Sequence, residues 1–149
     1  MTIQVTNADS SSSGAVTSVA RALPTGGTIT TSGGFRIHRF TSSGNFIVAS
    51  GVNLNCECLI VAGGGSGGSH SGGGGGAGGL LYYGAETPKT PNGAAIAVSS
   101  GTHAVTVGGG AASAHVGAYP NPSGNDGNKG TNSSIAFSST YTAIGGGGG

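Results

Sequence analysis

A glycine tract places the strongest constraint on this chain. Twelve of the seventeen residues from 63 to 79 are glycine, and an apolar, β-like run at 58–62 leads directly into them. Glycine loses more backbone freedom on folding than any other residue, so such a tract is costly to order. The chain therefore either leaves these residues as a flexible linker or needs backbone that carries no side chains. We favour the ordered alternative, because the tract grows from a strand and ends at Leu80.

The same residues match a dinucleotide-binding loop, with Gly63, Gly65 and Gly68 in the G-x-G-x-x-G register after an apolar strand. That loop needs a helix directly after it, because the helix N-terminus holds the pyrophosphate. Here the helix would have to form over residues 69–79, which are mostly glycine. Each glycine costs a helix about 1 kcal/mol relative to alanine. We therefore predict no nucleotide site.

Composition and charge exclude several classes of partner. Five basic and four acidic residues give the 149-residue chain a net charge of +1. This leaves no basic patch for nucleic acid. No apolar run approaches the length of a membrane-spanning helix, and the N-terminus lacks the features of a signal peptide. We expect no nucleic-acid partner, no membrane insertion, and an extracellular location reached by another route, such as lysis of a host cell.

The residues that usually carry chemistry form no recognisable site. Cys56 and Cys58 would lie near 7 Å apart on one side of a strand, at or beyond the reach of an unstrained disulfide, so we expect half-buried thiols. The histidines, His38, His70, His103 and His115, are scattered, and we expect His38 and His103 to be surface side chains on strands. No serine lies in a strand–turn–helix elbow. We predict no catalytic residue, no metal site and no cofactor, and hence no enzyme.

The pattern of apolar residues predicts an all-β fold of short antiparallel strands, arranged like a β-sandwich, with no substantial α-helix. We expect three hairpins, which pair 35–40 with 45–49, 94–98 with 103–107, and 134–137 with 141–144. A strand at 56–62 contains an apolar run, 59–62, suited to burial on both faces. Another short strand is expected at 80–83. We assign residues 1–34 to a linker or docking arm and 35–149 to a glycine-rich β domain that continues beyond Gly149.

Three of these strands run into glycine, which indicates that the β part aims several tracts in related directions. Glycine runs can adopt an extended helix of three residues per turn, whose backbone groups must find partners in neighbouring segments. We therefore expect packed polyglycine II-type helices. The glycines assigned to this bundle are Gly63, Gly64, Gly65, Gly72, Gly73, Gly74, Gly75, Gly76, Gly108, Gly109, Gly110, Gly145, Gly146 and Gly147.

Six motifs follow one another after residue 24: Thr25-Gly-Gly-Thr-Ile-Thr, Gly34-Phe-Arg-Ile-His-Arg-Phe-Thr-Ser-Ser-Gly-Asn-Phe-Ile-Val, Leu59-Ile-Val-Ala-Gly-Gly-Gly, Gly76-Ala-Gly-Gly-Leu-Leu, Gly101-Thr-His-Ala-Val-Thr-Val-Gly-Gly and Gly127-Asn-Lys-Gly-Thr-Asn-Ser-Ser. Their order and spacing resemble the glycine-rich domain of bacteriophage tail-fibre, adhesin and receptor-binding proteins. The resemblance implies β-strands with stacked polyglycine helices, exposure at a fibre tip in a virion, and loops that bind a host receptor. The first 24 residues depart from it.

Within that resemblance, the variable loops are expected to bind a host surface protein or glycan, because loops on a rigid scaffold usually carry recognition. The candidate receptor-binding residues are His115, Tyr119, Asn121, Asn125, Asp126, Tyr82, Tyr83 and Glu86. The sequence leaves open whether these loops contact a receptor or neighbouring subunits. Two other functions stay open: a self-assembling extracellular filament subunit with a purely structural role, in a homo-oligomer or with a fibre partner, and ice binding.

Overall fold

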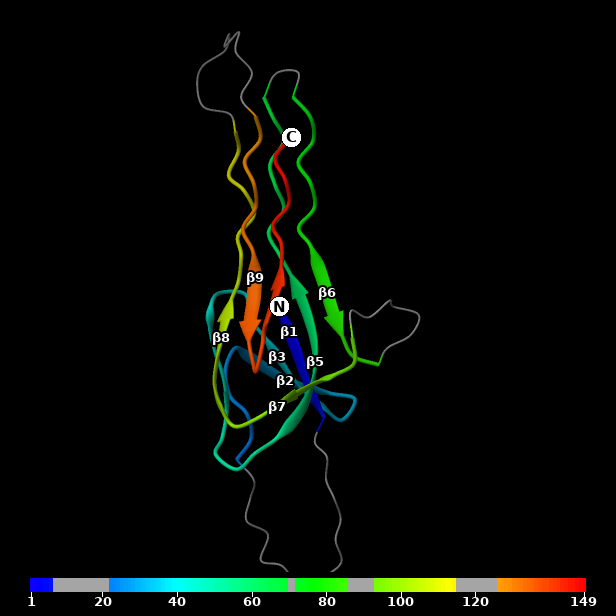
Figure 1. The fold of residues 1–149 in the computed structure, drawn as a ribbon, viewed down its shortest axis with the longest axis vertical. Helices are drawn as coiled ribbons and strands as arrows, with labels where there is room; N and C mark the ends of the chain where they lie inside the picture. The colour runs from blue at the N-terminus through cyan, green and yellow to red at the C-terminus, as the bar shows by residue number, and fades with distance from the viewer. Residues whose placement is uncertain (7–21, 70–71, 86–92, 115–125) are drawn as a thin grey trace, which may run out of the picture.

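The computed structural model describes residues 1–6, 22–69, 72–85, 93–114 and 126–149, which contain ten strands and no helix. The strands form two antiparallel sheets, which we call the β body. Glycine-rich segments extend from the β body toward the opposite end of an elongated molecule (Figure 1). The predicted all-β fold class is confirmed.

Sheet A has the strand order β2-β3-β1-β5-β6, and β7 also pairs with β5. Its strands are β1 (Thr2–Thr6), β2 (Thr28–Ser32), β3 (Phe35–Arg39), β5 (Leu54–Val61), β6 (Leu80–Tyr83) and β7 (Ile96–Val98). β6 pairs with the second half of β5 and β7 with its first half. The eight-residue β5 thus holds β1 on one side and both β6 and β7 on the other.

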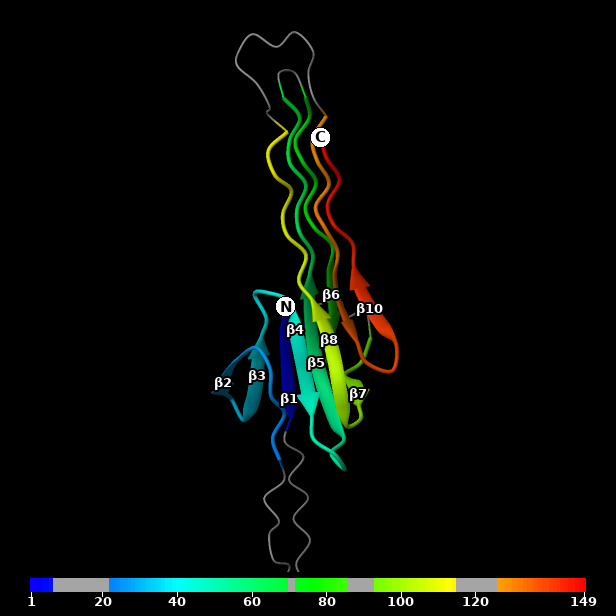
Figure 2. The ribbon, with the colours of Figure 1, turned by 90° about the vertical axis from the view of Figure 1, so that its left-hand side faces the viewer.

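Sheet B has the order β10-β9-β8-β4. Its strands are β4 (Gly44–Val48), β8 (Gly101–Thr106), β9 (Ser133–Ala136) and β10 (Thr140–Ala143). Figure 2 shows β4 and β8 of this sheet in front of β1 and β5 of sheet A.

A short bridge connects the chain before β2 to sheet B. Thr25 and Ile47 exchange backbone hydrogen bonds of 3.0 and 2.9 Å. The next residue, Gly26, has φ +111°, and a Cβ there would lie closer than 3.0 Å to the carbonyl oxygen of Asn45. Glycine is therefore required for the chain to leave the bridge and enter β2.

Two strands come from the region that the sequence analysis treated as a linker or arm. β1 lies between β3 and β5, with Ile3 opposite His38 on one side and Cys58 on the other. Ile3 and Val5 are fully buried. Two alternating apolar residues are too short a pattern to be recognised as a strand. Thr2–Thr6 and Thr28–Ser32 therefore belong to the β fold, and any docking role for residues 1–34 stays a prediction.

Two of the three predicted hairpins are wrong, although their strands exist. β3 and β4 follow each other in the chain but lie in different sheets, and so do β7 and β8. The third hairpin, β9 with β10, is confirmed, with Ile135 opposite Tyr141. Alternation of apolar residues shows which side of a strand is buried, but it does not show which sheet the strand joins.

The core lies between the two sheets, and Phe46 is its largest fully buried side chain. The Phe46 ring makes edge contacts with His38 and Phe137, at centroid distances of 5.0 and 6.2 Å. Along β5 burial alternates: Ile60 is fully buried, whereas Val61 is 43% exposed. The predicted burial of residues 59–62 on both faces is therefore wrong, because the outer side of β5 carries no second layer there.

Both strand histidines are buried, contrary to the expectation of surface side chains. On β3, His38 donates from Nδ1 to the carbonyl oxygen of Gly26 at 2.8 Å, since a carbonyl oxygen can only accept. Its Nε2 is buried without a hydrogen-bond partner. Burial lowers the pKa of His38, the nearby Arg36 charge lowers it further, and the bond to Gly26 partly opposes them. His38 is therefore a neutral core side chain.

Cys56 and Cys58 are free thiols, as predicted, but they are fully rather than half buried. Burial raises the pKa of Cys56 to about 12. The pKa of Cys58 is also raised, by burial and by the neighbouring Cys56 and Glu57. Both thiols are thus protonated core residues with the chemistry of small apolar side chains.

Acidification is expected to destabilise the protein through His38. Its pKa is lower in the folded state than the value of about 6.5 in an unfolded chain, so below pH 6.5 the unfolded state binds more protons. The contribution of His38 to stability is complete above pH 6.5 and is lost as the pH falls toward the folded pKa. Urea unfolding at several pH values should show this, and His38→Gln should remove that contribution. Equal slopes of stability against pH in the two proteins would contradict it.

Candidate functional site

Five chain segments, most of them rich in glycine, lie side by side beyond the β body and form a structure that we call the rod. They are segments I (62–69), II (72–79), III (108–114), IV (126–132) and V (144–149). Segments I, III and V leave the ends of β5, β8 and β10, whereas II and IV return into β6 and β9. Figures 1 and 2 show these segments running together away from the sheets. The prediction that the three strand-to-glycine junctions bring glycine tracts together is confirmed.

Segment I is the centre of the rod, because it forms backbone hydrogen bonds with all four other segments. Gly65 N–H donates to Gly76 of segment II at 2.9 Å, and Gly63 N–H donates to Thr131 of segment IV at 3.0 Å. Segment I also accepts bonds, from Ala111 N–H of segment III at 2.8 Å and from Gly146 N–H of segment V at 2.8 Å.

Within a pair of segments these bonds recur at every third residue. Residues 62, 65 and 68 of segment I donate to residues 79, 76 and 73 of segment II. Residues 146 and 149 of segment V donate to 63 and 66, and residues 127 and 130 of segment IV donate to 149 and 146. Three residues per turn is the repeat of an extended polyproline II helix. The predicted polyglycine helices require this spacing, and their helical conformation itself stays a prediction.

The same repeat divides segment II into three faces, of which one meets segment I. A Cβ added at Gly72, Gly75 or Gly78 would lie closer than 3.0 Å to backbone atoms of segment I. Real Cβ contacts of that length with backbone essentially do not occur, so this face can only be glycine. Residues 73, 76 and 79 form the second face, which meets segment V.

The third face of segment II points outward, and a matching face of segment V lies beside it. A Cβ at Gly74 or Gly147 would have no neighbour within 4 Å. Three-residue steps from these glycines lead to Ala77 on segment II and then to Leu80 at the start of β6, and to Ile144 on segment V. Leu80 is 59% exposed and Ile144 is 62% exposed. We call these five residues the outward strip; it combines open glycines with two exposed apolar side chains.

Polar side chains occupy the positions where the rod meets the β body. Ser133 Oγ accepts from Gly108 N–H at 2.9 Å, and Asn132 Oδ1 accepts from Gly145 N–H at 2.9 Å. Thr131 Oγ1 accepts from Gly109 N–H at 2.8 Å, and Ser43 Oγ accepts from Val107 N–H at 3.0 Å. These side chains satisfy backbone donors at the start of segments III and V.

All fourteen glycines that the sequence assigned to the bundle lie in segments I, II, III or V. Segment IV was missed, because it contains only two glycines and does not look like a tract. Gly127 and Gly130 are nevertheless the positions at which it closely approaches segment I, where a Cβ would come within 3.0 Å of backbone. Their spacing of three residues was the signal that could have revealed it.

The structure does not bring the receptor-binding candidates into one described cluster. Asp126 is exposed and is the first residue of segment IV. Segment IV starts at the end of the rod far from the sheets (Figure 1). Tyr82 and Tyr83 lie instead on β6 in the β body. Tyr82 is 7% exposed and donates to Glu57 at 3.3 Å, and Tyr83 makes an edge contact with Tyr141 at 4.9 Å. The other candidates, Glu86, His115, Tyr119, Asn121 and Asn125, lie outside the described residues.

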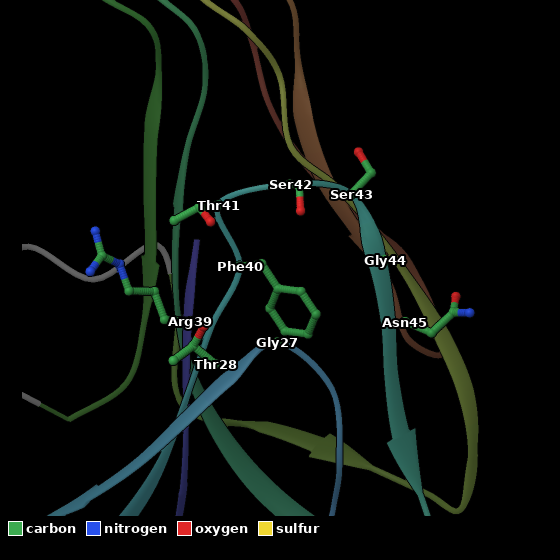
Figure 3. A pocket seen from close by; sticks show the side chains of 9 residues that line it. All are labelled: Gly27, Thr28, Arg39, Phe40, Thr41, Ser42, Ser43, Gly44 and Asn45. Carbon is green, nitrogen blue, oxygen red and sulfur yellow. The ribbon is translucent and has the colours of Figure 1, made fainter.

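A hollow of about 210 Å³ lies beside Phe40, lined by residues 27–28 and 39–45 (Figure 3). Its volume is below the ~300 Å³ at which ligand pockets usually begin. Arg39 is its one charged lining residue, and its side chain extends away from the Phe40 ring (Figure 3). We assign no chemistry to this hollow.

Across the described ranges, no three His, Cys, Asp or Glu side chains gather where they could hold a metal ion. The same ranges contain no helix long and apolar enough to span a membrane. The G-x-G-x-x-G residues enter segment I rather than a helix.

Comparison with known proteins gives one match. A family described as a glycine-rich domain matches residues 41–149, which include β4–β10 and the whole rod. No curated protein and no solved structure matches the chain.

Alanine substitution at two adjacent glycines should distinguish the face of segment II that meets segment I from the face that points outward. Gly75→Ala should lower the free energy of unfolding by about 1–3 kcal/mol, the usual cost of overpacking, because its Cβ would collide with segment I. Gly74→Ala should leave it unchanged or raise it by up to about 1 kcal/mol, since it restricts the unfolded chain and meets nothing. Denaturant unfolding of both variants measures the difference, and equal effects would contradict the packing described for the rod.

Proposed function

We propose that this chain, which belongs to the glycine-rich domain family, is a structural fibre protein of a phage tail or another extracellular appendage and attaches to a host surface through loops. The observation that supports this most is the rod. Its segments are joined by hydrogen bonds. Segments I and III lead away from the β body, segments II and IV lead back to it, and segment V leads away again.

Such a scaffold suits presentation of loops at a distance from a base. Segment III ends at Ala114 and segment IV begins at Asp126. Segment III ends, and segment IV begins, at the end of the rod that is remote from the sheets (Figure 1). They are tied there by Asn128, whose side-chain amide donates to the Ala112 carbonyl at 3.2 Å. Rigid attachment of a loop lowers the entropy lost when the loop binds.

The residues between these two segments have the composition of a recognition loop. Tyr119, Asn121 and Asn125 combine flat apolar area with hydrogen-bonding groups, and Asp126 adds an exposed carboxylate beside them in the sequence. We propose a host surface protein or glycan as the partner. The proposed role is attachment without catalysis, on a virion tail fibre or a comparable extracellular structure.

Replacement of residues 115–125 by a glycine–serine sequence of equal length should abolish attachment. The purified protein, fluorescently labelled, would be incubated with a panel of bacterial strains, and bound protein counted per cell. The variant should lose binding to every strain that the natural sequence labels, and its thermal unfolding should be unchanged because the described segments are kept. The same replacement over residues 86–92 tests separately whether the second candidate loop, which contains Glu86, contributes to binding. Retained binding in the 115–125 variant would overturn this assignment of the receptor loop.

A self-assembling filament subunit is the second candidate, and the outward strip favours it. Among the described residues, no neighbouring atom gives a steric reason for glycine at Gly74 or Gly147, yet both positions carry the entropic cost of glycine. Close approach of another backbone would explain it, as it explains the glycines that face segment I. Leu80 and Ile144 would then be covered at the same contact.

The filament hypothesis predicts that Leu80→Ser combined with Ile144→Ser reduces self-association and leaves the fold intact. Negative-stain images and sedimentation velocity of the purified protein would show long assemblies before the substitution and small particles after it. Ile47→Ser is a matched control, because Ile47 is also exposed, at 43%, but lies on β4 away from the strip. Discrete particles for the unsubstituted protein at all concentrations would exclude the filament.

A further inference from the structure

Strand β1 lies in the middle of sheet A, between two strands that come later in the chain. It pairs antiparallel with β3 on one side and with β5 on the other, over all five of its residues. Met1 extends the pairing with β3, because its amine donates to Phe40 at 3.0 Å and its carbonyl oxygen accepts from Phe40 N–H at 2.9 Å. Without β1, both β3 and β5 would have an open edge, and an open edge is a template for pairing with another strand.

The side chains of β1 also complete the core. Ile3 and Val5 are fully buried, and they lie opposite the buried Cys58 and Cys56 of β5. The space that β1 fills is therefore a groove with backbone donors and acceptors along both walls and buried side chains along its floor. A groove of this kind binds an extended strand whose alternate side chains are apolar, as in donor-strand complementation.

The connection after β1 is long. Fifteen residues, 7–21, separate this strand from the next described residue, Ala22. A chain spans at most about 3.3–3.6 Å per residue, so this connection can reach roughly 50 Å. Within that reach, β1 of one copy can make in a neighbouring copy the same contacts that it makes in its own. Exchange of an identical element between copies is a low-cost route to assembly.

The family match places the two sides of this contact in different parts of the chain. Residues 41–149, which match the glycine-rich domain, include β5 but not β1. The matched residues alone therefore leave one edge of β5 open over Asn55–Leu59, where β1 pairs. The strand that covers this edge comes from the part of the chain before the match.

We propose that the groove between β3 and β5 accepts β1 from a second copy of this chain, so that copies are joined by strand exchange. β1 and the groove are different surfaces, so each copy can donate its strand to one neighbour and accept a strand from another. This proposal goes beyond the proposed function and does not rest on it. The contact is separate from the outward strip and from residues 115–125, so the substitutions described above for those regions should leave it intact.

Two full-length variants with one new cysteine each test the exchange. Gln4 on β1 lies opposite Ile37 on β3. Both residues face away from the core, because their neighbours Ile3 and His38 are buried and successive side chains of a strand point to opposite sides. Directly opposite residues of paired strands are within reach of a disulfide. A disulfide between Gln4→Cys in one chain and Ile37→Cys in another therefore reports β1 of the first chain in the groove of the second.

The two variants would be unfolded in urea, mixed, refolded together and oxidised, and the disulfides would be identified by mass spectrometry. Dimers linked between positions 4 and 37 should form, and their yield should rise with protein concentration. Thr30→Cys in place of Ile37→Cys is the matched control, because Thr30 also faces away from the core but β3 separates it from β1. This control should lose the dimer. A yield for positions 4 and 37 no higher than for positions 4 and 30, at every concentration, would overturn the proposal.

A second test uses the full chain with its own strand disabled. Ile3→Asp with Val5→Asp should keep β1 out of the core, because an unpaired carboxylate is costly to bury. A synthetic peptide with the natural sequence of residues 1–7 should then bind this variant and raise its melting temperature. A peptide that carries the same two aspartates is the control and should do neither. If the natural peptide has no more effect than the control peptide, insertion of β1 from another molecule is excluded.

Discussion

The structure depends on the close approach of four backbone segments to segment I. Each neighbour forms hydrogen bonds with it at 2.8–3.1 Å, and glycine faces it at the contact positions of segments II, IV and V. Side chains there would collide with backbone, which cannot move aside as a flexible side chain can. The entropic cost of ordering so much glycine is offset by backbone hydrogen bonds and close contact rather than by apolar burial. This explains how a chain with 34 glycines and few large apolar residues can build an extended, ordered structure.

The β body makes this packing possible because it fixes where the segments begin. β5, β8 and β10 all end at the same side of the two sheets, so segments I, III and V leave in a common direction. Ser133, Asn132 and Thr131 then accept from backbone N–H groups at the point where the sheet hydrogen bonds stop. A small core around Phe46 is enough for this purpose, since the rod adds no apolar layer of its own.

The sequence predicted the strands well and their partners poorly. Apolar alternation located β3, β4, β5, β8 and the β9–β10 hairpin, because these runs contain several large residues. It could not show that β3 and β4 separate into different sheets, which depends on contacts far apart in the chain, such as Ile3 with His38. It missed β1, with only two apolar residues, and segment IV, where Gly127 and Gly130 alone carry the three-residue spacing. It also placed His38 and His103 at the surface, because a polar residue in a strand gives no sign that Gly26 or Ser99 will supply a buried partner.

The lack of side chains also decides which parts of the molecule can recognise a partner. A glycine face offers only backbone groups and Cα hydrogens, so it can pack closely against another backbone but cannot distinguish one side-chain pattern from another. Under the proposed function, selective recognition would therefore use residues beyond the glycine faces, such as the exposed Asp126 at the start of segment IV. The outward strip has the opposite character. Gly74 and Gly147 permit close contact with another backbone. The exposed apolar side chains of Leu80 and Ile144 favour such a contact but do not select a partner by its charge. Attachment and self-association would thus use separate surfaces of one scaffold, and a substitution at either surface would leave the other unchanged.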